Sequence, residues 1–338
     1  MFVQVAVPVA VAVVVIAYKA LKPPPPKICG TPGGPPVTSP RIKLKDGRYL
    51  AYREAGVSKD EAAYKIVFIH GFNSSKFQSL PVSQGIVEEL KLYFLYFDRA
   101  GYGESDPNPK RSVKSEAFDI QELADALQLG SRFYVIGTSL GGYAAWSCLY
   151  YIPHRLAGMA LVVPFIHYWW PKIPRELSRR VIRMLPDVSD RWTFRVAHYV
   201  PWLFYWWMTQ KWFPTLSFLS GGPSVFTQSD LKILKKLSKD PQKTQQGVYE
   251  SLYRDIMVGY ASWEFGPLDV RNPFPDNNGK GRVHLWQGYE DKIIPDEMNR
   301  YITKQVPWIK YHEVFDGGHL FIFEQHKCDL VIKALVLG

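Results

Sequence analysis

The sequence predicts an α/β fold with a mostly parallel central sheet, helices on both of its faces and an inserted helical segment. The first observation is a series of short apolar runs, each of strand length and bounded by glycine or polar residues. The second is helical periodicity between these runs, because strands that alternate with helices form parallel sheets. The third is residues 166–264, where this alternation is lost and tryptophan accumulates.

The folded body is expected to begin near residue 41. Residues 41–56 alternate apolar and polar side chains around Asp46-Gly47, which is typical of a hairpin with a two-residue turn. The apolar runs that follow predict buried strands at KIVFIHG (65–71), LYFLYFD (92–98), RFYVIGT (132–138) and LAGMALVVPF (156–165).

Two helices are predicted among these strands. Residues 112–130 place their apolar side chains on one helical stripe, and the final Gly130 is a common C-terminal cap. A second helix begins directly after residue 139 and extends to about residue 151. The alternation resumes at the end of the chain, with strands at 282–291 and 309–315, each followed by a helix.

Residues 166–264 are interpreted as a helical cap that divides the body into a first half, 41–165, and a second half, 265–338. This cap holds eight of the eleven tryptophans. Four of them are candidates for substrate contacts: Trp169, Trp170, Trp206 and Trp207. The alternative is that they form only the core of the cap, since pockets and cores are both apolar.

The N-terminal residues 1–22 predict a membrane anchor. They are apolar from Phe2 to Tyr18 except for Gln4, and lysines follow this run without any preceding it. Such a run is at the short end of the length of a membrane span. A cleaved signal peptide would carry its basic residues before the apolar run, so the flanks favour an uncleaved anchor. A stiff linker rich in proline and glycine, 23–40, connects the anchor to the body.

The charge flanking the anchor indicates where the body lies. Positive residues after an apolar span keep the following chain in the cytoplasm. We therefore expect the catalytic domain to face the cytosol; the membrane we expect it to be attached to is that of the endoplasmic reticulum. The sequon Asn73-Ser74-Ser75 favours the same side, because a glycan there would lie beside the candidate site.

The composition excludes several classes of function. A net charge of +10 suits an anionic membrane surface or nucleic acid, but no nucleic-acid-binding signature is present. The three cysteines are far apart and indicate neither a disulfide framework nor a metal site. The sequence has no dinucleotide fingerprint and no phosphate-binding loop. We expect no cofactor, no metal and no obligate protein partner.

Ser139 is the candidate nucleophile. A serine hydroxyl is a weak nucleophile that needs an adjacent base and an exposed position on a sharp turn. The segment Gly137-Thr138-Ser139-Leu140-Gly141 links a predicted strand to a predicted helix, and its glycines leave room for such a turn. This context favours a catalytic role over that of a small residue in a glycine-rich loop.

An oxyanion hole is predicted from two backbone N–H groups. Acyl transfer places negative charge on the carbonyl oxygen, which such donors stabilise. The N–H of Leu140 follows the nucleophile at the start of a helix. The second donor is expected from the loop after an earlier strand, where His70-Gly71-Phe72 offers the N–H of Phe72.

His319 is the candidate base. It follows Gly317-Gly318 on a loop after the last predicted strand, a position from which it can reach the serine. His312 and His326 are weaker candidates, because they fall inside a predicted strand and a predicted helix.

The acid that orients the histidine is expected at the end of strand 282–291. Asp291 is favoured because Gly288 and Pro295 frame it in a turn, and Glu290 remains the alternative. Asp98 is a rival that precedes the serine in the chain, whereas the expected order is serine, acid, histidine. Its DRAGYGESD segment is expected to organise a loop beneath the site.

These motifs together resemble the α/β-hydrolase superfamily. They are His70-Gly71, Asp98-Arg99-x-Gly101-Tyr102-Gly103-x-Ser105, Gly137-x-Ser139-x-Gly141, Gly288-x-x-Asp291 and Gly317-Gly318-His319, in the order typical of the family. The resemblance spans the body and implies an α/β-hydrolase fold with a helical cap. It favours the esterase and lipase branch, because relatives that cleave epoxides or carbon–halogen bonds carry aspartate in place of Ser139. The anchor and WEFGPLDV (263–270) resemble membrane-anchored plant members.

The sequence therefore predicts a serine carboxylesterase or lipase. Its substrate is expected to be a hydrophobic or lipid-like ester that arrives from the membrane and is cleaved through an acyl-enzyme. Two alternatives remain open. One is an acyltransferase that uses the same triad, and the other is a hydrolase-fold binding or receptor protein with little turnover.

Overall fold

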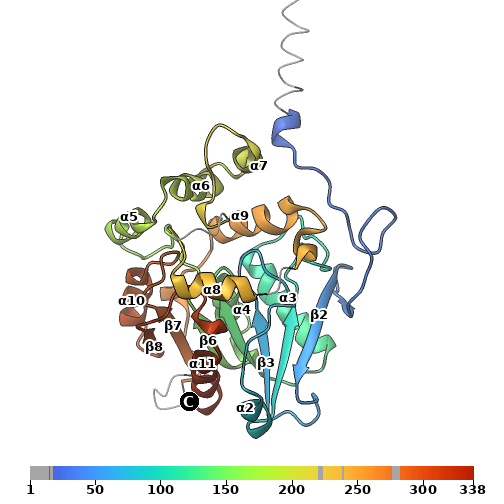
Figure 1. Ribbon diagram of the computed structural model, residues 1–338, viewed down its shortest axis with the longest axis vertical. Helices are drawn as coiled ribbons and strands as arrows, with labels where there is room; N and C mark the ends of the chain where they lie inside the picture. The colour runs from blue at the N-terminus through green and yellow to red at the C-terminus, as the bar shows by residue number, and fades with distance from the viewer. Residues whose placement is uncertain (1–14, 16–17, 220–223, 238–239, 276–281) are drawn as a thin grey trace, which may run out of the picture.

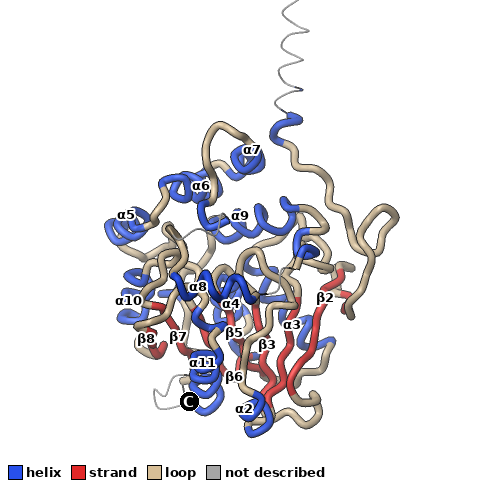
Figure 2. The backbone as a smooth tube through the Cα atoms, viewed as in Figure 1, coloured by secondary structure: helices blue, strands red, loops and turns tan. Residues whose placement is uncertain are grey.

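The computed structural model describes residues 15, 18–219, 224–237, 240–275 and 282–338. In this part of the chain an eight-stranded sheet has the order β1-β2-β4-β3-β5-β6-β7-β8. The first two pairings, β1 with β2 and β2 with β4, are antiparallel, and all others are parallel. These pairings confirm the predicted, mostly parallel sheet, and Figure 2 shows its strands lying among the helices. The strands are β1 (Arg41–Lys43), β2 (Tyr49–Gly56), β3 (Tyr64–Ile69), β4 (Leu92–Phe97), β5 (Phe133–Thr138), β6 (Leu156–Val162), β7 (Val283–Gly288) and β8 (Ile309–Val314).

Helices cover both faces of the sheet, as predicted (Figure 1). All residues of β4 are buried, and successive side chains enter opposite cores. Tyr93 and Leu95 belong to the cluster formed with α3, α4 and α10, whereas Phe94 and Tyr96 belong to the one formed with α2 and α11. The short α2 was not predicted, because six residues carry little periodicity. These helices are α2 (Gln84–Glu89), α3 (Val113–Ala126), α4 (Gly141–Tyr151), α10 (Asp296–Gln305) and α11 (Gln325–Leu337).

Helices are the regular elements of the inserted segment in its described part, where loops connect them. Figure 1 shows its helices gathered at one end of the sheet, with α8 and α9 nearest to the strands. Because β5 ends at the proposed nucleophile, this is the end at which a catalytic site is expected. The cap helices are α5 (Arg175–Met184), α6 (Val188–Tyr199), α7 (Phe204–Thr209), α8 (Gln228–Lys236) and α9 (Arg254–Tyr260).

Asp255, on α9, ties the cap to the body. Its carboxylate accepts two hydrogen bonds of 2.6 Å from Arg99 and one of 2.9 Å from Arg111. The hydroxyls of Tyr102 and Tyr143 donate to the same carboxylate at 2.7 and 2.6 Å. Burial raises the pKa of Asp255, but the two guanidinium groups outweigh this effect and lower the pKa to about 2. A fully buried cluster of ion pairs and hydrogen bonds thus holds the cap on the body of the protein.

Removing the Asp255 carboxylate should destabilise the fold. We expect Asp255→Ala to lower the free energy of unfolding by about 3–5 kcal/mol, because it leaves two arginines buried without their partner. Urea unfolding measures this change. The control Glu297→Ala breaks an exposed ion pair with Arg180 and should lower the unfolding free energy by about 0–1 kcal/mol. If both variants lowered the free energy of unfolding by similar amounts, the buried ion cluster of Asp255 would not be what holds the cap on the body.

The predicted anchor, 1–22, lies mostly outside the described residues; of its last part, Val15 and residues 18–21 are helical. None of the helices in the described part of the chain has the length and apolar character to cross a bilayer. The linker 23–40 contains no helix or strand, and its end is bound to the body. The N–H groups of Thr38 and Ser39 donate to the buried carboxylate of Glu104 at 2.9 and 3.0 Å.

Candidate active site

Ser139 occupies a strained turn between β5 and α4. Its φ of +51° lies in the left-handed region, which is uncommon for residues other than glycine. Hydrogen bonds on both sides hold this conformation. The Ser139 N–H donates to the carbonyl of Val162 at 3.0 Å, and its carbonyl accepts from the N–H groups of Gly142 and Phe165 at 2.9 and 2.8 Å. The side chain is thereby presented at the end of the sheet.

The glycines on either side of Ser139 are required by close approach. A Cβ atom at Gly137 would lie 2.6 Å from that of Ala145. One at Gly141 would lie 2.5 Å from the carbonyl oxygen of His70. Neither backbone position has room for a side chain, so the motif glycines allow the helix to begin directly beside the strands.

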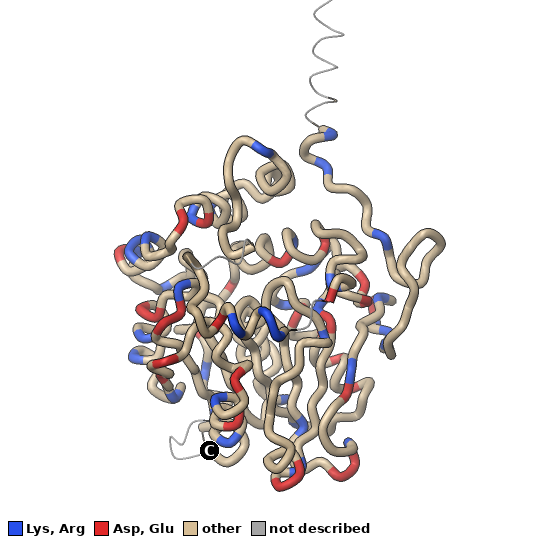
Figure 3. The backbone as a smooth tube through the Cα atoms, in the orientation of Figure 1, with Lys and Arg blue, Asp and Glu red and all other residues tan. Residues whose placement is uncertain are grey.

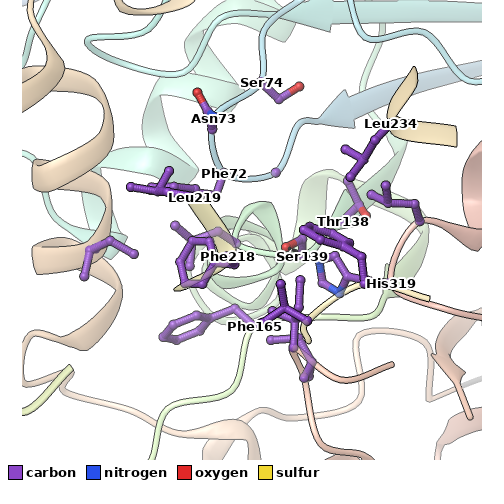
Figure 4. A pocket seen from close by; sticks show the side chains of 18 of the residues that line it. Phe72, Asn73, Ser74, Thr138, Ser139, Phe165, Phe218, Leu219, Leu234 and His319 are labelled. Atoms are coloured by element: carbon purple, nitrogen blue, oxygen red, sulfur yellow. Dashed lines mark hydrogen bonds between the residues drawn. The ribbon is translucent and has the colours of Figure 1, made fainter. Parts of the chain in front are cut away.

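The three residues of the predicted triad lie in one hydrogen-bonded chain. Nε2 of His319 is 2.8 Å from Oγ of Ser139, and its Nδ1 is 2.8 Å from Oδ2 of Asp291. Figure 4 shows the His319 ring beside Ser139. A carboxylate only accepts hydrogen bonds, so Nδ1 carries the proton and Nε2 accepts from the serine hydroxyl. The other carboxylate oxygen accepts from the N–H groups of Ile293 and Ile294 at 2.8 and 3.0 Å.

The structure brings Asp291 to His319 and leaves the alternatives elsewhere. Glu290 is exposed, and its N–H donates to the carbonyl of Gly317. The carboxylate of Asp98 is buried and pairs with Lys76 at 2.7 Å. It also accepts the Glu104 N–H at 3.1 Å, so it organises a loop as expected.

Charge around His319 affects its pKa. Burial lowers the pKa of the imidazole, but the carboxylate of Asp291 and then that of Asp230 oppose this effect. The net result is a pKa above the ordinary histidine value. The base is therefore protonated over a wider range at low pH than a free imidazole.

This shift predicts the acid limb of the pH profile. We expect kcat/KM to fall as pH decreases, with a midpoint above about 6.5, because protonated His319 cannot accept the serine proton. Ester hydrolysis measured from acid to neutral pH tests this, with separate controls for stability at each pH. If the midpoint of the acid limb lay below the ordinary pKa of histidine, the two carboxylates would not be raising the pKa of His319.

The Gly71–Phe72 peptide is oriented by hydrogen bonds to its carbonyl. The Gly71 oxygen accepts from Nδ1 of His70 at 2.8 Å and from Nη2 of Arg99 at 3.3 Å. The Arg99 N–H donates to Nε2 of His70, which leaves the imidazole proton on Nδ1. Burial and then the charge of Arg99 lower the pKa of His70 well below its usual value and keep the ring neutral. In a planar trans peptide the N–H points opposite to the carbonyl, so that of Phe72 faces away from His70.

The Ser139–Leu140 peptide is oriented in the same way, since the Ser139 carbonyl is bound by two N–H groups. Neither the Phe72 N–H nor the Leu140 N–H has a hydrogen-bond acceptor among the described residues. The Gly71 backbone passes directly against the serine, because a Cβ there would lie 3.1 Å from that of Ser139. Two backbone donors without an acceptor in the described part of the chain thus belong to the segments beside Ser139, as an oxyanion hole requires.

A cavity of about 740 Å³ opens at Ser139 and His319. Phe218 of the cap packs edge-to-face on Phe72, with ring centroids 5.3 Å apart, and both lie on the wall drawn in Figure 4. The cap supplies most of the apolar lining, through Tyr168, Leu185, Phe194, Phe218, Leu219, Phe226, Leu234 and Ile256. The site can therefore hold an apolar group beside the serine.

Residues 66–334 match the Alpha/beta hydrolase family. The chain belongs to the α/β-hydrolase family. The resemblance seen in the sequence motifs is confirmed, and the fold is the one it implied.

Solved structures of other α/β hydrolases have the same fold at low identity. A thermophilic esterase from Thermogutta terrifontis has a TM-score of 0.57 at 20% identity, over 87% of this chain and 97% of its own. An alpha/beta hydrolase fold protein from Chitinophaga pinensis has a TM-score of 0.57 at 18% identity, over 89% and 97%. An esterase from Exiguobacterium antarcticum has a TM-score of 0.52 at 16% identity, over 89% and 100%.

In this α/β hydrolase the four candidate tryptophans do not line the cavity at Ser139. Trp169 and Trp170 border a separate cavity in the cap, whereas Trp206 contacts Trp212 and Trp207 stacks on Phe213. The aromatic lining comes mainly from phenylalanines. Sequence reasoning missed these because periodicity in a short cap helix does not separate a cavity wall from a packed core.

Proposed function

We propose that this α/β hydrolase is a serine carboxylesterase or lipase that acts on esters with a hydrophobic acyl group. The observation that carries the proposal is the chain of hydrogen bonds from Asp291 through His319 to Ser139, which opens into a largely apolar cavity. The esterase descriptions of two similarly folded proteins are consistent with it. The class of reaction is acyl transfer to water.

The geometry supports a two-step mechanism. Oγ of Ser139 attacks the ester carbonyl while Nε2 of His319 accepts the hydroxyl proton. The resulting oxyanion accepts hydrogen bonds from the N–H groups of Phe72 and Leu140. His319 then gives its proton to the departing alcohol, which leaves Ser139 acylated. Water attacks the acyl-enzyme by the same steps, releasing the acid and restoring the serine.

The lining of the cavity predicts a preference for longer acyl chains. We expect kcat/KM to rise by about fourfold for each CH₂ that becomes buried, from acetate upward until the cavity is filled. Ile256→Trp, which fills part of the cavity, should favour shorter chains and preserve acetate hydrolysis. A panel of nitrophenyl esters of graded length measures both effects.

The same panel distinguishes the alternatives. An added alcohol that captures most of the acyl group as a new ester would indicate an acyltransferase. Wild-type protein that turns over no ester would overturn the enzymatic proposal and favour a binding protein. If the wild type hydrolysed short and long acyl chains equally well, the cavity would not be the binding site of the acyl chain.

We also propose that residues 1–22 anchor the protein, with the body facing the cytosol at the endoplasmic reticulum. The support is the apolar sequence and the lysines that follow it. Figure 3 shows basic positions where the N-terminal segment joins the body and along α5 and α8. Deletion of residues 1–22 should release the protein from membranes in fractionation. Continued retention would mean that another element binds the membrane.

A further inference from the structure

Asp230 of the cap is bound to the backbone of the histidine loop. Its side chain is buried, with the residue only 1% exposed. Oδ2 accepts the N–H of His319 at 3.1 Å, and Oδ1 accepts the N–H of Leu320 at 2.7 Å. Oδ2 also accepts the N–H of Thr227, the N-cap of α8, at 3.1 Å. One carboxylate thus joins the start of a cap helix to the loop that carries the candidate base.

The glycine before His319 is explained by this contact. A Cβ atom at Gly318 would lie 2.2 Å from Oδ2 of Asp230 and 2.6 Å from its carboxyl carbon. Only glycine lets the loop approach the carboxylate so closely. The Gly-Gly-His motif is therefore shaped in part by a residue of the cap, 89 positions earlier in the chain.

The same helix also forms part of the substrate cavity. Leu234 lies one turn after Asp230 on α8, and Leu237 follows one turn later; both line the cavity. Figure 4 shows Leu234 on the wall of the cavity that holds Ser139 and His319. An acyl chain that packs against Leu234 therefore contacts the helix that holds the histidine loop.

We propose that Asp230 is a positioning residue that couples occupation of the acyl cavity to the placement of His319. This inference rests on the proposed esterase function, and it assigns to the cap a part in positioning the base. The carboxylate holds the histidine loop, and an acyl chain against Leu234 holds α8 in the position from which Asp230 makes these bonds. Binding energy from the acyl chain then raises kcat instead of only lowering KM.

Asp230 also acts on His319 electrostatically. Among the described residues, the charges of Asp291, after the end of β7, and of Asp230, on α8, both raise the pKa of this imidazole. Lys292 and Lys243 line the same cavity. Removing the charge of Asp230 should lower the His319 pKa, so the acid limb of activity moves to lower pH.

The first experiment compares Asp230→Asn with the wild type on a long-chain ester and on acetate. An amide has one acceptor oxygen, and its NH₂ group would face N–H donors, so the histidine loop loses at least one bond. We expect kcat on the long-chain ester to fall by about 10- to 100-fold with KM little changed. The kcat ratio of the long-chain ester to acetate should approach one, and the acid limb should move to lower pH.

Thr227→Ala is the matched control. Thr227 accepts the Asp230 N–H through its hydroxyl and caps α8, whereas the bonds to the N–H groups of His319 and Leu320 come from the Asp230 carboxylate. It should lower the melting temperature, with a smaller loss of kcat than in Asp230→Asn and with an unchanged acid limb, because the Asp230 carboxylate remains. The same loss of kcat in both variants would mean that Asp230 only stabilises the helix, and would overturn the proposal. So would an Asp230→Asn enzyme with an unchanged kcat and acid limb.

Two further measurements test the role of Asp230 if the first experiment fails for another reason. If Asp230→Asn does not fold, Leu234→Ala should lower the kcat ratio of the long-chain ester to acetate; an unchanged ratio would overturn the coupling. If the wild type turns over no ester, the proposed function fails by itself. NMR titration of labelled histidine then decides the role of Asp230, since an unchanged His319 pKa in Asp230→Asn would overturn it.

Discussion

Ser139→Ala is expected to lower kcat/KM for ester hydrolysis by a factor of about 10⁴ to 10⁶. The substitution removes the atom that lies 2.8 Å from the imidazole of His319, and nothing else in the triad can form the acyl-enzyme. Residual activity from the oxyanion donors and the cavity alone remains far below that of the complete site. A fluorophosphonate probe, which labels activated serines, should modify the wild type and leave Ser139→Ala unlabelled.

Ser74→Ala is the control for this prediction. Ser74 lines the same cavity, but its hydroxyl is bound to Gln78 and not to a histidine. Its removal should leave labelling and turnover within about threefold of the wild type. If Ser139→Ala were labelled as strongly as the wild type, Ser139 would not be the nucleophile.

Asp291→Asn is expected to lower kcat by a factor of about 10³ to 10⁴. An asparagine amide can donate to Nδ1 of His319, which would move the imidazole proton to Nε2 and prevent it from accepting the serine proton. The imidazolium formed during the reaction would also lose its facing charge. Steady-state kinetics of a purified variant measure the loss, and the pH profile should show a lowered His319 pKa.

Glu290→Gln separates the two neighbouring acids. Glu290 is exposed and its side chain makes no contact with His319 among the described residues. The variant should keep kcat within about twofold, since changes at exposed positions have small effects. A large loss in Glu290→Gln together with an active Asp291→Asn would reverse the assignment.

The sheet and the catalytic turn were predictable because their signals are local. A strand buried on both faces needs a continuous apolar run, and β4 is such a run with all of its residues buried. The turn at Ser139 needs glycines at fixed offsets, because Gly137 and Gly141 each face atoms closer than a Cβ allows. Both requirements can be recognised within a few residues of sequence.

For the acid that orients His319, the sequence narrowed the choice to two neighbouring residues. Asp291 and Glu290 are adjacent, so sequence position separates them poorly. Their different roles come from the turn after β7, which binds Oδ1 of Asp291 to the N–H groups of Ile293 and Ile294 and turns its other oxygen toward His319. The direction of a side chain at a strand end depends on such hydrogen bonds.

The cap was predictable in its secondary structure but not in the residues that line the cavity. Its helical character followed from composition, but the tryptophans predicted as substrate contacts do not line the cavity at Ser139, whereas Phe218 and Leu234 do. Asp230 carried no signal at all, because a carboxylate in the first turn of a helix is ordinary as a helix cap.

By itself the sequence determined the parallel sheet, the order of the motifs and the residues from which a nucleophile, a base and an acid could come. These depend on periodicity and on backbone geometry within single turns. Only the tertiary structure decided which carboxylate meets His319, which cap residues line the cavity at Ser139, and that Asp230 binds the histidine loop. Those contacts join segments far apart in the chain, and their partners are selected by packing in three dimensions, which a local pattern does not encode.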